Sequence, residues 1–177
     1  MTPERFVRLR RWWASARSTV ITLTWEARFW ALVGIVGIFW KPLSTSIAVI
    51  FFMLQELDFH ELPDALANVR AALKTGGVVR ILVPDIRKAF AAWFCENEEW
   101  FPQDDRTGGI DAKFCTYLTW YGTSKSVFTP AYLQAVLAQA GFSEAHECNY
   151  GRSKTSFSGM VGLDSRPREA MVFEATR

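Results

Sequence analysis

Cysteine and histidine are scarce in this chain. Its 177 residues include 3 cysteines and 2 histidines. Cys95, Cys115 and Cys148 lie far apart, are odd in number, and form no CxxC pair or local Cys/His cluster. This argues against a disulfide framework and predicts no metal site. Scattered thiols of this kind are typical of a reducing compartment, so we expect a cytoplasmic protein.

The chain also lacks a strong charge of either sign. Its formal net charge is +2, which leaves no electrostatic footprint for binding nucleic acid. Hydrophobic residues make up 50% of the sequence and charged residues 21%, a balance that argues against global disorder. The length allows one domain with a sizeable core.

No hydrophobic run is long enough to cross a membrane. Residues 29–40 are apolar but stop at Lys41-Pro42, whereas a spanning helix takes about 20 apolar residues. A basic region before an apolar run leaves a secretory signal open. Glu26, Arg28 and the lack of a small-residue cleavage pattern argue against it. The run is therefore interpreted as a core element or an interfacial segment.

Tryptophan and arginine are concentrated at the start of the chain. Five of the eight tryptophans lie in the first 40 residues, beside a cluster of five arginines. Within this region the pattern predicts a basic helix over residues 4–17 and a short strand over residues 20–24. We divide the chain into a Trp/Arg-rich segment, residues 1–46, and an α/β domain, residues 47–177. Residues 1–40 also suit a weak contact with a membrane surface.

The most informative stretch is AALKTGGVVRILVPD, residues 71–85. An apolar stripe at helical spacing precedes it and predicts a helix over residues 62–74. The stripe consists of Leu62, Leu66, Val69 and Leu73. Gly76 and Gly77 can end the helix in the left-handed conformation. The strand that follows, residues 78–83, is apolar except for Arg80, which is typical of a parallel sheet buried on both faces.

The remaining elements continue this alternation. Strands are predicted over residues 47–54, 144–150 and 169–176, and helices over residues 86–94 and 130–140. Residues 95–122 are interpreted as a mixed insertion with an acidic run and loop signals. From residue 47 the order is strand, helix, strand, helix, insertion, helix, strand, strand. This order predicts a three-layer α/β sandwich whose mostly parallel sheet has an antiparallel edge.

These residues resemble a known family. LPDALANVRAALKTGGVVRILVPD is similar to the middle of class I S-adenosylmethionine-dependent methyltransferases, where a helix ending in LKPGG precedes the fifth strand. LQAVLAQAGF, YGRSKTS and RPREAMVFEATR follow in the order found in a bacterial subgroup associated with polysaccharide and cell-envelope gene clusters. The resemblance covers about residues 50–177. It implies a Rossmann-like fold, S-adenosylmethionine as cofactor, and a small-molecule or saccharide methyl acceptor.

The first part of the chain departs from the family pattern. Nothing in residues 1–46 supplies the glycine-rich GxGxG turn that brings the backbone close to the cofactor, so the fold is expected to be incomplete at its N-terminus. A degenerate region, a shifted reading frame and a genuine variant all explain this. The family's LEHL element aligns with Leu54, Gln55, Glu56 and Leu57. The resemblance implies that the first three of these bind the cofactor.

Other candidate residues follow the strand of residues 78–83. Asp85 lies just past its carboxyl end, where open α/β sheets bind ligands. It is interpreted either as a catalytic base or substrate contact, or as the N-cap of the next helix. Arg87 and Tyr121 shape a substrate pocket or have solvated and packing roles. His60 is expected at the surface and Ser153 in a turn.

Three hypotheses about function follow. Methyl transfer needs little beyond alignment of the reactants, often with a base, so no strong catalytic signature is expected. The chain is a methyltransferase-like protein, a non-catalytic remnant or interaction subunit, or a peripheral membrane protein anchored by its first segment. The missing turn and the Gln55-Glu56 pair predict weak cofactor binding.

Overall fold

The apolar runs of the sequence form one mixed sheet. The computed structural model describes residues 20–23, 45–103 and 108–177. In this part of the chain the strands are β1 (Val20–Leu23), β2 (Thr45–Phe51), β3 (Leu73–Pro84), β4 (Ser143–Cys148) and β5 (Ala170–Thr176). They lie in the order β1-β2-β3-β5-β4. The first three run parallel, whereas β5 and β4 each pair antiparallel. The predicted antiparallel edge is confirmed.

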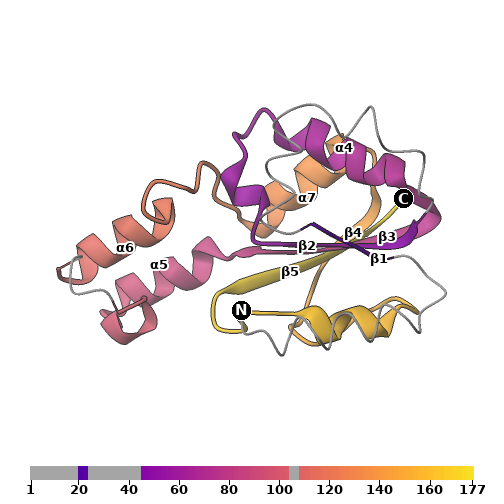
Figure 1. The fold of residues 1–177 in the computed structure, drawn as a ribbon. Coiled ribbons are helices and arrows are strands. Elements are labelled where there is room, and N and C mark those ends of the chain that lie inside the picture. The colour runs from indigo at the N-terminus through magenta and orange to yellow at the C-terminus, as the bar shows by residue number, and fades with distance from the viewer. Residues whose placement is uncertain (1–19, 24–44, 104–107) are drawn as a thin grey trace.

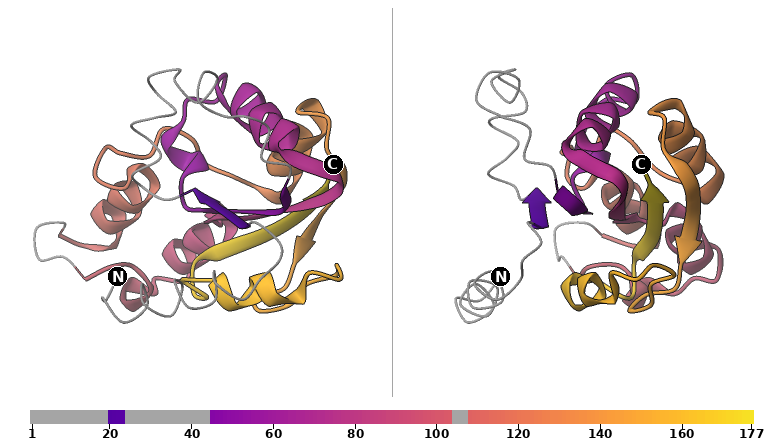
Figure 2. Two further views of the ribbon diagram at one scale, coloured as in Figure 1. Left: turned by 45° about the vertical axis from the view of Figure 1, so that its right-hand side comes forward. Right: turned by 90° about the vertical axis from the view of Figure 1, so that its right-hand side faces the viewer.

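Three layers are built on this sheet. Helices α4 (Leu62–Ala72) and α7 (Pro130–Gln139) cover one face, and the opposite face is covered by the short helix η3 (Ser158–Leu163) and its flanking loops (Figure 1 and Figure 2). The apolar stripes of α4 and α7 pack against the sheet in the largest core cluster. The predicted three-layer α/β sandwich is thus confirmed, with only a short helix in its third layer.

The join between α4 and β3 differs from the sequence prediction. The helix ends at Ala72, and Leu73 and Lys74 already belong to the strand. Gly76 adopts a φ of +73°, a conformation that side chains with a Cβ rarely take. At Gly77 a Cβ would lie 2.8 Å from the carbonyl oxygen of Lys74. The two glycines therefore bend the start of β3 instead of capping the helix.

The N-terminal segment contributes to the same sheet. β1 pairs in parallel with β2, in a register that places Val20 opposite Ile47. The division of the chain at residue 46 stays a prediction. The helix over residues 4–17, the apolar run over residues 29–40 and the membrane contact lie outside the described residues. Among the helices of the described part, none has the length and apolarity needed to cross a membrane.

Residues 95–122, predicted as a mixed insertion with loop signals, contain a helix. The helix α6 (Ile110–Thr119) packs beside α5 (Ile86–Phe94), and both extend beyond the sheet at one end (Figure 1). The short helix η2 (Glu98–Trp100) completes this second core, which is rich in aromatic rings. On α5 the buried residues are Ala89 and Ala92, whereas Phe90 is 52% exposed.

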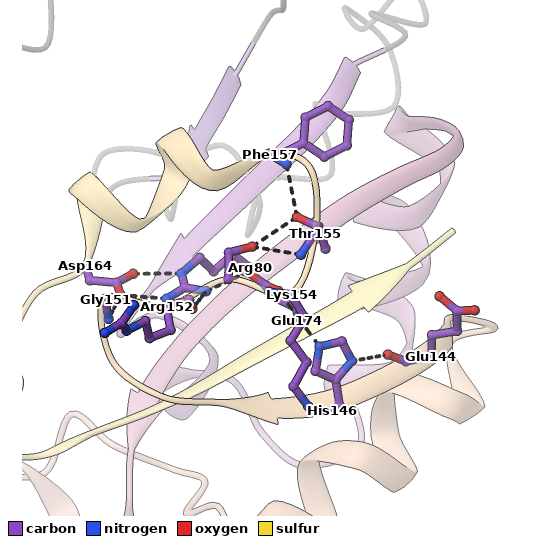
Figure 3. Close-up of polar contacts among 11 residues, drawn as sticks. Arg80, Glu144, His146, Gly151, Arg152, Lys154, Thr155, Phe157, Asp164 and Glu174 are labelled. Carbon is purple, nitrogen blue, oxygen red and sulfur yellow. Dashed lines mark hydrogen bonds and ion pairs between the residues drawn. The ribbon is translucent and has the colours of Figure 1, made fainter.

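A buried arginine ties the second face of the sheet together. The side chain of Arg80 is 0% exposed and forms ion pairs of 2.6 Å with both Asp164 and Glu174. Its Nη1 also donates to the carbonyl of Arg152 at 3.0 Å. Asp164 in turn accepts from the backbone N–H of Gly151 at 2.8 Å (Figure 3). This Arg80 cluster fastens the loop of residues 149–164 to β3 and β5.

We predict that Leu73→Ala lowers the free energy of unfolding by about 2–5 kcal/mol, the usual cost of emptying a buried leucine site. Leu73 is 1% exposed and packs in the largest core cluster. Its neighbour Lys74 is exposed, so Lys74→Ala serves as the matched control, with a change within about 0.5 kcal/mol. Urea unfolding of both variants measures the difference. Equal midpoints for the two would contradict the packing described.

Candidate functional site

Most of the predicted site residues gather at one edge of the sheet. β2 and β3 run parallel and end at Phe51 and Pro84. The short helix η1 (Leu54–Glu56) follows β2, and Asp85 follows β3. This is the carboxyl edge of the parallel strands, where ligands bind in open α/β sheets.

Gln55 holds the loops of this edge together. Its side-chain Nε2 donates to the carbonyl of Phe52 at 2.6 Å. Its own carbonyl accepts from the backbone N–H groups of Lys125 and Ser126 at 2.7 and 2.9 Å. The side-chain Oε1 is buried and has no hydrogen-bond partner among the described residues. Gln55 therefore carries a buried acceptor beside the loops of this edge, and an N–H or O–H group could pair with it.

The other two predicted cofactor residues are placed differently. Leu54 is 3% exposed, and its side chain packs in the main core cluster. Only its backbone is available to a ligand. Glu56 is half-buried in the same turn. Gln55 is the more deeply buried polar side chain of this turn.

Asp85 caps α5, as one of its two interpretations predicted. Its carboxylate accepts from the backbone N–H of Arg87 at 3.0 Å. The guanidinium of Arg87 also binds it through two hydrogen bonds of 3.0 and 2.8 Å. The Asp85 side chain is 2% exposed. Both carboxylate oxygens are therefore occupied within the protein, and a role as base would require Arg87 to move aside.

Arg87 lies between two carboxylates at the surface. Besides Asp85, its guanidinium contacts Glu147 on β4. The hydrogen bond to Asp85 and then the one to Glu147 raise the pKa of Arg87 above its ordinary value. The Arg87 side chain is 49% exposed. It thus places a positive charge at the surface beside Asp85.

Strained residues collect at the same edge. Among the described residues, six with a Cβ have a positive φ, and four of them lie here: Phe52, Trp120, Tyr121 and Arg166. The guanidinium of Arg166 lies 4.7 Å from the ring centre of Phe52 and 5.4 Å from that of Trp120. Such conformations cost about 1–3 kcal/mol each and gather at functional sites. The sequence carried no signal for this cluster beyond Tyr121, which is 50% exposed.

A buried phenol lies behind this cluster. The hydroxyl of Tyr117 donates to Glu169 at 3.0 Å, and its ring packs edge-on against Trp120. Burial, followed by the charge and hydrogen bond of Glu169, raises the pKa of Tyr117. The phenol therefore stays protonated at neutral pH and acts as a hydrogen-bond donor.

Two minor sequence predictions are confirmed. His60 is exposed. Ser153 forms a turn in which its hydroxyl accepts from the backbone N–H of Thr155 at 3.1 Å.

The structure also brings together three polar residues that the sequence did not predict to be neighbours: His146 and Cys148 on β4 lie next to Glu174 on β5. An H-x-C spacing in a strand was the available signal, because alternate residues share a face.

Comparison with known structures identifies the fold. A methyltransferase from Mesorhizobium loti that depends on S-adenosylmethionine matches 96% of this chain over 85% of its own length, at 14% identity and a TM-score of 0.51. PigF, solved with SAH, matches 90% of this chain and 48% of its own, at 11% identity and a TM-score of 0.50. Human N-acetylserotonin methyltransferase, solved with SAM, matches 78% of this chain and 31% of its own, at 14% identity and a TM-score of 0.44.

The first two of these likenesses, with TM-scores of 0.51 and 0.50, show that the chain has the fold of class I S-adenosylmethionine-dependent methyltransferases. It spans 48% of the length of PigF and 31% of that of the human enzyme. No protein-family model and no curated protein matches the sequence.

We predict that Asp85→Ala lowers the free energy of unfolding by about 0.5–2 kcal/mol, the usual cost of losing an N-cap. Asp85→Asn keeps an N-cap acceptor and is expected to lose less than Asp85→Ala. Asp64 in the first turn of α4 is exposed and is not an N-cap, so Asp64→Ala is the control. Thermal unfolding of the three variants provides the measurement. A loss in Asp64→Ala as large as that in Asp85→Ala would refute the capping role.

Proposed function

We propose that this chain is a methyltransferase-like protein that binds S-adenosylmethionine weakly at the carboxyl edge of β2 and β3. The observation that carries the proposal is the buried, unused acceptor Oε1 of Gln55, at the edge where this fold binds ligands. The cofactor bears amino groups that can donate to such an acceptor. When bound, it supplies an activated methyl group on a sulfonium.

The weakness of binding follows from what the sequence lacks. Without a glycine-rich turn, backbone N–H groups do not approach the cofactor, and each unpaired polar group costs about 1–3 kcal/mol. Two or three such losses weaken binding by roughly a hundredfold or more. Gln55 in place of an acidic residue also removes a charge that would attract the cofactor's positive groups.

The acceptor in this proposal is a small molecule or saccharide, held beside Arg87 and Tyr121. Both side chains are about half exposed, and Trp120 provides a neighbouring aromatic face. Asp85 orients Arg87 through the two hydrogen bonds described above. Catalysis in this arrangement rests on alignment of the acceptor with the methyl group. The cytoplasmic location and the link to polysaccharide gene clusters, both inferred from the sequence, are part of the same proposal.

We predict that S-adenosylhomocysteine binds the purified full chain with a dissociation constant near 0.1–1 mM, about a hundredfold weaker than micromolar binding. Gln55→Met is expected to weaken binding about tenfold or more, since it removes the acceptor. Gln139 is exposed at the end of α7, so Gln139→Met is the matched control. Isothermal titration gives the constants, and circular dichroism checks that each variant folds.

Two results would contradict this proposal. No heat at millimolar ligand would show that the chain is a non-catalytic remnant of the fold. Low-micromolar binding would show that residues 1–46 build a complete cofactor site, and the account of weak binding would then be wrong.

A further inference from the structure

Three potential metal ligands meet on the face of the sheet that lies under the loop of residues 149–164. His146 and Cys148 project from β4, and Glu174 projects from β5 directly opposite His146. Their ligand atoms all lie within 4.8 Å of one another. The group is separate from the carboxyl edge, because Glu174 pairs with Arg80, whereas Pro84 and Ala170 mark that edge.

The imidazole of His146 is oriented for binding a metal. Its Nδ1 lies 2.7 Å from the carbonyl of Glu144, and since a carbonyl only accepts, Nδ1 carries the proton. In the neutral ring Nε2 then has a free lone pair. This Nε2 is buried and has no hydrogen-bond partner among the described residues. Metal-binding histidines usually donate their other N–H to a carbonyl or carboxylate in this way.

A bulge in β4 produces this orientation. The pairing of β4 with β5 shifts register between Ser143 and His146, and Glu144 adopts a φ of +51°. Bulges redirect side chains and are common beside functional sites. Here the bulge brings both the Glu144 carbonyl and the His146 ring to the same point, next to Glu174 (Figure 3).

The gap between His146 and Glu174 is not closed by a hydrogen bond. Nε2 lies 3.9 Å from Oε2 of Glu174, beyond the usual donor–acceptor distance of about 2.7–3.2 Å. A lone pair that faces a carboxylate is unfavourable unless a proton or a metal ion lies between them. Ligand atoms around a tetrahedral zinc ion are about 3.3–3.8 Å apart, given bonds of about 2.0–2.3 Å. A small contraction of the group would therefore enclose such an ion.

The net charge of the neighbouring buried side chains also favours a bound cation. Arg80 carries one positive charge, and Asp164 and Glu174 carry two negative charges when ionised, all in side chains at most 1% exposed. The cluster is left with one excess negative charge in a region where charges are costly. Lys154 is exposed, so water screens its ammonium. A zinc ion together with a Cys148 thiolate brings the sum to zero.

We propose that His146 Nε2, Cys148 Sγ and Glu174 Oε2 bind one zinc ion. Nitrogen, thiolate and carboxylate ligands are the set that zinc takes in proteins, and three protein ligands leave a fourth position for water. Binding releases the Cys148 proton to solvent. Without metal this thiol holds its proton, because burial and then Glu174 raise its pKa to about 11. The ion joins β4 to β5 and neutralises the Arg80 cluster.

The test uses cobalt(II), whose bond to a thiolate gives a near-ultraviolet charge-transfer band, and zinc(II) as its competitor. The background is the full chain with Cys95→Ser and Cys115→Ser, both exposed positions, so that Cys148 is the remaining thiol. We expect one equivalent of cobalt(II) to produce the band and one equivalent of zinc(II) to abolish it. Zinc(II) also raises the melting temperature, because it binds the folded state.

Two variants locate the site. His146→Gln is expected to weaken zinc(II) affinity at least about a hundredfold, since even loss of a supporting hydrogen bond costs about 10- to 100-fold. His60→Gln is the matched control, because His60 is exposed and is the other histidine of the chain. The His146 side chain is 29% exposed, which favours a folded variant, and Cys148→Ser provides an independent loss of the band.

The proposal is overturned if the background protein gives no thiolate band with cobalt(II). It is equally overturned if His146→Gln and His60→Gln bind zinc(II) with the same affinity.

Discussion

The structure depends on how it accommodates one guanidinium group inside the sheet. Arg80 interrupts an otherwise apolar central strand, and its side chain is completely buried. Burial works against its charge, but hydrogen bonds and attraction from Asp164 and Glu174 outweigh this and raise the pKa of Arg80. The positive charge therefore persists at any pH the protein meets. Both carboxylates must stay beside it, because an uncompensated buried charge costs about 3–5 kcal/mol.

This requirement determines the rest of that face. Glu174 comes from β5, directly opposite Arg80, while Asp164 follows η3 and fixes the loop of residues 149–164. The YGRS element is part of the arrangement, because Gly151 donates to Asp164 and the Arg152 carbonyl accepts from Arg80. The loop then places Met160 and Phe157 over β2 and β3. The third layer is thus held on the sheet by the ion pairs and hydrogen bonds of Arg80, where a long covering helix would otherwise pack.

The sequence predicted most of the regular architecture. The stripe of α4 and the helix over residues 130–140 follow from local sequence patterns, and the structure reproduces both elements. The ion cluster and the edge site were harder to predict, because they join residues far apart in the chain. Arg80 and Glu174 are both charged residues in strands that are otherwise buried and largely apolar. Once β3 and β5 are paired, each explains the other.

The misses have physical causes as well. α6 buries aromatic rings against α5 and η2, and such a helix lacks the aliphatic stripe that marks α4. At the carboxyl edge, strain at Phe52, Trp120 and Arg166 comes from backbone geometry that no residue type announces. The buried acceptor of Gln55 also depends on tertiary contacts, because the backbone N–H groups of Lys125 and Ser126 donate to the Gln55 carbonyl from a distant loop. The sequence alone does not indicate this contact.

Hydrogen exchange on the Arg80→Met variant tests the central role of the guanidinium most directly. Methionine fills the space but leaves Asp164 and Glu174 without their counter-ion. The account predicts that amides of the loop of residues 149–164, including Gly151 and Lys154, lose protection first and most, while β2 and α4 keep more of theirs. Wild-type protection in that loop, or an equal loss across the whole domain, would contradict it.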